Sequence, residues 1–77
     1  MSTEYQVDDL VRVQFFPGLE NEALMTKEVH RIFARTRRSD GKFIYFIKTA
    51  DSSIVTYYAE NLRFATKEET LVYKLCQ

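Results

Sequence analysis

Hydrophobic and polar residues alternate in short stretches along this chain, and a period of two residues is typical of β-strands. Turn-forming residues such as Pro17, Gly18 and Gly41 separate the stretches. The pattern also predicts a loop with one helical turn around residues 22–25 and a short 3₁₀ turn at residues 59–61. The predicted strands are residues 10–15, 27–36, 42–48, 54–58 and 62–65.

The end of the chain follows a different period. Thr66 followed by Glu69 matches a capping box, in which each side chain accepts a hydrogen bond from the backbone N–H of the other residue. Leu71, Val72 and Leu75 then fall on one stripe of a helix. We therefore expect a C-terminal helix over residues 67–75.

The strand pattern over residues 7–65, with Leu62 before the last strand, resembles that of SH3-like small barrels of the Tudor and KOW type. The resemblance implies a mainly β fold. It would be a five-stranded SH3-like barrel at residues 1–65, followed by a short C-terminal α-helix at residues 66–77 that packs on the barrel or on a partner. Methyl-reading Tudor domains typically have Asp-Tyr-Gly where this chain has Lys48-Thr49-Ala50-Asp51. The resemblance therefore assigns no specific family, and fold alone does not give function.

The turn between the second and third strands decides which side chains share a face. Asp-Gly pairs favour two-residue hairpin turns, and such a turn at Asp40-Gly41 places Arg37 opposite Ile44. Arg35 then lies opposite Phe46. With a second two-residue turn at Ala50-Asp51, the core face would carry Ile32, Ala34, Thr36, Phe43, Tyr45, Ile47, Ile54, Thr56 and Tyr58. The other face would carry Phe33, Arg35, Arg37, Ile44, Phe46, Lys48, Val55 and Tyr57.

This second face is predicted to be apolar with a cationic border. A large apolar patch on a small protein marks an interface, so something should cover it. The chain's own C-terminal helix, a second copy and a different macromolecule are the three alternatives. The residues expected to bind a partner are Arg35, Arg37, Phe46, Tyr57, Lys48 and Ile44, with Tyr57 and Arg37 as the hot spots because aromatic and guanidinium groups carry most interface energy.

The surface predicts a small non-enzymatic protein-binding module. Such a module would be an adaptor, an assembly subunit, or an inhibitor of a host protein of the kind that phages and mobile elements encode. The expected partner is a protein of acidic character, including a second copy that offers its acidic residues Glu20 and Glu22. No cofactor, metal or small-molecule substrate is expected. His30 is expected to be a surface or structural histidine, and no set of residues forms a catalytic constellation.

The alternative is a small barrel that binds nucleic acid through the basic hairpin at residues 31–48. Cations would contact phosphates, and aromatic side chains would stack on bases. The sequence pI of about 6.6 is low for such a domain, and the carboxylates in residues 1–24 would repel a polyanion. The cations concerned are Arg31, Arg35, Arg37, Arg38, Lys42 and Lys48.

From its composition, we expect the 77-residue chain to be cytoplasmic. Its single cysteine, Cys76, excludes an internal disulfide and fits a reducing compartment. The N-terminal residues lack the basic and apolar regions of a signal peptide, and no stretch approaches the roughly 20 apolar residues that span a bilayer. We therefore expect no contact with a membrane.

Overall fold

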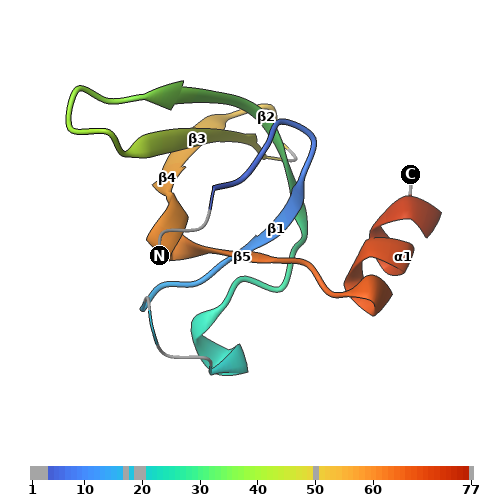
Figure 1. Cartoon of the computed structure of the whole chain (residues 1–77). Coiled ribbons are helices and arrows are strands. Elements are labelled where there is room, and N and C mark those ends of the chain that lie inside the picture. The colour runs from blue at the N-terminus through green and yellow to red at the C-terminus, as the bar shows by residue number, and fades with distance from the viewer. Residues whose placement is uncertain (1–3, 17, 19–20, 50, 77) are drawn as a thin grey trace.

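The computed structural model describes residues 4–16, 18, 21–49 and 51–76 (Figure 1). Five strands form one antiparallel sheet in the order β4–β3–β2–β1–β5. The predicted mainly β fold, with five strands and a C-terminal helix, is confirmed. The elements are β1 (Leu10–Val13), η1 (Glu22–Leu24), β2 (His30–Arg37), β3 (Phe43–Lys48), β4 (Ile54–Tyr58), η2 (Ala59–Asn61), β5 (Leu62–Phe64) and α1 (Lys67–Leu75).

The sheet bends because β2 belongs to both of its halves. The start of β2 pairs with β1, and the rest pairs with β3 after a register shift between Ile32 and Ala34. Such a β-bulge bends a strand and increases its twist. The two edge strands, β4 and β5, are joined by η2 and do not pair with each other, so the expected barrel remains open between them (Figure 1).

The core lies inside the curve of the sheet. It contains Tyr5, Val11, Val13, Ile32, Tyr45, Ile47 and Leu62, with Phe43 and Tyr57 packed against it. Tyr5 precedes the first strand and is only 3% exposed. Its backbone N–H donates to the Tyr45 hydroxyl at 3.0 Å, and its own hydroxyl donates to the Leu62 carbonyl at 2.9 Å. The segment before β1 therefore closes the core, a role that strand periodicity does not predict.

The C-terminal helix begins and ends where the sequence predicts. Its capping box forms between Thr66 and Glu69. The helix projects from the end of β5, away from β3 and β4 (Figure 1). Its apolar stripe is exposed, with Leu71 at 61% and Leu75 at 83%. The first of the three alternatives, in which the chain's own helix covers the face around Phe46, is therefore wrong.

Candidate interaction surface

The hairpin between β2 and β3 has a different register from the predicted one. The Arg38 N–H donates to the Lys42 carbonyl at 2.7 Å, which leaves three residues in the loop instead of two. Gly41 is in the left-handed region with φ of 88°, as three-residue hairpin loops require at their last position. Arg37 therefore pairs with Phe43 instead of Ile44.

The loop between β3 and β4 is also one residue longer than predicted. The Thr49 N–H donates to the Ser53 carbonyl at 2.8 Å, and Ser52 takes the left-handed position with φ of 70°. Tyr57 therefore pairs with Tyr45 instead of Ile44, and Ile54 pairs with Lys48 instead of Ile47. A one-residue shift in register moves every side chain of a strand to the other face.

The predicted partner-binding residues consequently divide between two faces. Ile44, Phe46 and Lys48 share the side of the sheet that faces away from the core, as expected. The predicted face is wrong for the other three, which lie on the core side of the sheet: Arg35, Arg37 and Tyr57. The opposite error applies to residues that were assigned to the core and lie on the outer side: Ala34, Thr36, Ile54, Thr56 and Tyr58.

Arg35 is a structural residue in this position. Its Nη1 donates to Glu4 Oε1 and to the Tyr5 carbonyl, both at 2.8 Å. Its guanidinium also lies 4.7 Å from the centre of the Phe43 ring. Arg35 thus holds the segment before β1 against the β2–β3 hairpin. Arg37 extends over the same ring at 5.9 Å.

We define the outer face as the uncovered side of β2, β3 and β4. Its centre is apolar: Phe33 is 38% exposed, Ile54 is 59% exposed, and Ile44 and Phe46 are half-buried. The rings of Phe33 and Phe46 meet edge to face at 6.3 Å. Register and alternation put three cations around this centre: Arg31, Arg38 and Lys48.

The cations of the outer face differ in their partners. Arg31 lies 3.8 Å from Asp8, and both side chains are more than half exposed. Arg38 stacks over the Tyr58 ring at 5.7 Å and also donates to its hydroxyl. Across the described ranges, neither Arg38 nor Lys48 forms an ion pair with a carboxylate. Two cations of the outer face therefore have no charge partner within the described structure.

The six cations predicted for nucleic-acid binding do not gather on one surface. Arg31, Arg38 and Lys48 border the outer face, whereas Arg35 and Arg37 lie on the core side. Lys42 stands at the hairpin loop and borders a groove of about 400 Å³ together with Glu4, Arg37, Phe43, Tyr45 and Glu60. That groove carries both charge signs. The acidic residue Glu20, expected to meet a second copy, lies outside the described residues, as does the side chain of Glu22.

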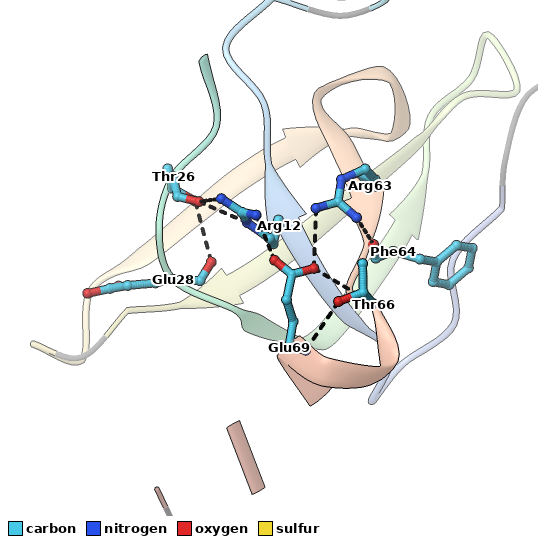
Figure 2. Close-up of polar contacts among 7 residues, drawn as sticks. All are labelled: Arg12, Thr26, Glu28, Arg63, Phe64, Thr66 and Glu69. Carbon is cyan, nitrogen blue, oxygen red and sulfur yellow. Dashed lines mark hydrogen bonds and ion pairs between the residues drawn. The ribbon is translucent and has the colours of Figure 1, made fainter. Parts of the chain in front are cut away.

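A polar cluster fixes the helix to β1 and β5 (Figure 2). Arg12 is 5% exposed; its Nη1 donates to Glu69 Oε2 at 2.6 Å, and its Nε and Nη2 donate to the Thr26 carbonyl. Arg63 approaches the other oxygen of Glu69 at 3.3 Å. Sequence analysis predicted only the cap at Thr66. Because Arg12 and Glu69 are 57 residues apart, no local pattern indicates this contact.

The cluster makes stability depend on pH. Burial by itself raises the pKa of Glu69, but the Thr66 N–H and the Arg12 guanidinium outweigh it and lower the pKa from 4.5 to about 2. A lowered carboxyl pKa stabilises the folded state above pH 4.5, and this contribution disappears as the pH falls toward 2. We expect urea denaturation to show a constant advantage of the wild type over Glu69→Gln from pH 5 to 8, which shrinks below pH 4.5. An advantage that is unchanged at pH 2.5 would contradict the assignment.

A second groove, of about 740 Å³, lies between the helix and the segment before β2. Val29, His30, Val72, Tyr73 and Cys76 are among its lining residues. Burial lowers the pKa of His30 below its usual 6.5, which keeps the imidazole neutral near pH 7. Among the described residues, no cluster of histidine, cysteine and acidic side chains is placed to hold a metal ion. The described part of the chain also has no helix with the length and apolar character needed to cross a bilayer.

Comparison with known proteins adds no relative from which a function could be transferred. No family model matches the chain, and neither the curated proteins nor the solved structures contain a significant match.

Proposed function

We propose that this chain is a small protein-binding module, whose outer face binds a partner segment that is both apolar and acidic. The observation that supports the proposal is the uncovered centre formed by Phe33, Ile44, Phe46 and Ile54. Contiguous apolar patches on small proteins mark interaction sites. The helix that could have covered this patch is held at β1 and β5 instead.

Charge complementarity argues for an acidic partner. Arg38 and Lys48 border the apolar centre without a carboxylate partner in the described structure. Arg38 is also ordered in advance by the Tyr58 ring and hydroxyl, so less side-chain entropy is lost when it binds. Aromatic and arginine side chains are the residues that most often dominate binding energy. Arg38 and Phe46 are therefore the proposed hot spots, in place of Arg37 and Tyr57.

The same geometry favours a protein over a nucleic acid. A phosphate backbone requires several cations along one surface. Here Arg35 is paired with Glu4, Arg31 lies beside Asp8, and Arg37 lies on the other side of the sheet. An apolar centre with few cations at its rim suits a protein segment. We assign the module the role of an adaptor, assembly subunit or inhibitor that occupies a partner's surface in the cytoplasm.

The test compares two matched double variants. Phe46→Ser with Lys48→Glu changes the outer face, and Leu71→Ser with Lys74→Glu makes the same types of change on the exposed helix. Affinity capture from nuclease-treated lysate identifies the partner, and calorimetry with the purified partner measures Kd. We expect the outer-face variant to bind at least about tenfold more weakly, since 1.4 kcal/mol is a factor of ten and burying one phenylalanine contributes roughly 1.5–3 kcal/mol. The helix variant should bind like the wild type.

Thermal melting of both variants keeps the result interpretable, because Phe46 is half-buried. A folded outer-face variant that binds with undiminished affinity would refute the proposed site. Capture that disappears on nuclease treatment would favour the nucleic-acid alternative instead.

A further inference from the structure

We infer that the free edge of β4 is a second interaction surface, which pairs antiparallel with β4 of a second copy of this chain. The inference is independent of the proposed function of the outer face. It rests on the backbone of Ile54–Tyr58 and on the order of side chains along that strand.

The two edges of the sheet are protected to different extents. At the β5 edge, side chains hydrogen-bond to the backbone carbonyl groups. The Leu62 carbonyl accepts from the Tyr5 hydroxyl and from Gln14 Nε2, and the Phe64 carbonyl accepts from Arg63. Over the ranges that the structure describes, no side chain hydrogen-bonds to the backbone of β4. An edge strand is normally blunted by charges, proline or a bulge, because its free N–H and C=O groups attract another strand. The sequence Ile-Val-Thr-Tyr-Tyr contains no charge and no proline.

The ladder with β3 determines which β4 groups remain free. The Thr49 N–H bonds to the Ser53 carbonyl, and hydrogen-bonded pairs alternate along an antiparallel ladder. Val55 and Tyr57 therefore direct their N–H and C=O groups toward β3. The backbone groups of Ile54 and Thr56 and the N–H of Tyr58 point outward from the sheet, whereas the Tyr58 carbonyl belongs to the N-cap of η2. These three residues offer a row of donors and acceptors to a further strand.

The side-chain order of β4 identifies a second copy as the strand that fits. A two-fold axis at Thr56 places Ile54 opposite the partner's Tyr58 and Val55 opposite the partner's Tyr57. Each pair joins a β-branched to an aromatic side chain, which is a favourable cross-strand combination. Thr56 meets its own copy, and no charge faces a charge. The sequence of β4 is thus complementary to itself when read in the opposite direction.

Pairing through β4 would also change the outer face. Residues directly opposite each other in a ladder lie on the same face, so the two outer faces would lie side by side on one continuous sheet. The dimer would then present two copies of the Phe46 centre to a partner. Specific stable interfaces usually bury at least about 1,200 Å² of surface. A single pair of five-residue strands is expected to bury less than this, so we expect weak, concentration-dependent association.

Sedimentation velocity over a range of protein concentrations tests the inference. Thr56→Lys places two like charges opposite each other at the two-fold axis, whereas the control Thr36→Lys adds the same charge to an exposed outer-face position on β2. We expect the wild type and Thr36→Lys to form dimers as the concentration rises. Thr56→Lys should weaken dimerisation at least tenfold.

Cross-linking in a Cys76→Ser background gives an independent measure. With a short bis-maleimide reagent, Thr56→Cys should form covalent dimers at least tenfold faster than Thr36→Cys. A wild type that stays monomeric at millimolar concentration would refute the inference. Equal effects of the two lysine variants, or equal cross-linking of the two cysteine variants, would do so as well. The outer-face variant Phe46→Ser with Lys48→Glu should dimerise like the wild type, so the two proposals can fail separately.

Discussion

Replacing Tyr5 by alanine is expected to lower the free energy of unfolding by roughly 3–5 kcal/mol, the usual cost of removing a buried large aromatic side chain. Tyr5 is 3% exposed and its ring meets those of Tyr45 and Phe64 at 5.4 and 4.6 Å. Small domains unfold with a total of about 5–15 kcal/mol, so the variant should be partly unfolded at 37 °C. Urea denaturation followed by circular dichroism measures the change.

The conservative variant Tyr5→Phe separates packing from hydrogen bonding. It keeps the ring and removes the hydroxyl that donates to the Leu62 carbonyl, so a loss of about 1 kcal/mol is expected. If alanine costs no more than phenylalanine, the segment before β1 does not close the core.

Replacing Glu69 by alanine is expected to lower the free energy of unfolding by about 3 kcal/mol, because breaking a buried ion pair costs roughly 3–5 kcal/mol and Glu69 remains partly exposed. The substitution removes the carboxylate that Arg12 and Arg63 share and also half of the capping box. For a domain of this size, 3 kcal/mol corresponds to a decrease in Tm of about 12–24 °C.

Glu68→Ala is the matched control for this substitution. Glu68 is a neighbouring carboxylate on the same helix, is exposed, and forms no ion pair in the described part of the chain. An exposed substitution of this kind usually changes stability by less than about 0.5 kcal/mol. Equal melting temperatures for the two variants would show that the cluster does not hold the helix.

Local sequence patterns predicted the elements of this fold more accurately than their relative positions. The C-terminal helix and β4 have the predicted bounds because their signals, a capping box and a β-branched and aromatic run, lie within each segment. Loop length had weaker signals. Asp40-Gly41 is compatible with loops of two or three residues. Ser52 has a positive φ, but serine, unlike glycine or asparagine, does not indicate such a conformation in a sequence.

These ambiguities in loop length determined which predicted site residues were assigned to the correct face of the sheet. Ile44, Phe46 and Lys48 were placed correctly because alternation within β3 does not depend on either turn. Arg37 and Tyr57 were placed through the turns, and each was assigned to the wrong face. The contacts of Tyr5 with Leu62 and of Arg12 with Glu69 join residues 57 positions apart, so strand and helix periodicity could not predict them.

The bulge between Ile32 and Ala34 has a consequence for aligning this chain with other small β proteins. Relative to a strand without the bulge, the chain has one extra residue inside β2, where alignment methods least readily open a gap. An ungapped alignment would match each hairpin residue after Ile32 to a residue one position away from its structural equivalent in the other protein. It would equate inward-facing arginines with outward-facing small residues, and a genuine structural relative would then look unrelated in sequence. Alignments of this chain should therefore allow a single-residue insertion at Phe33.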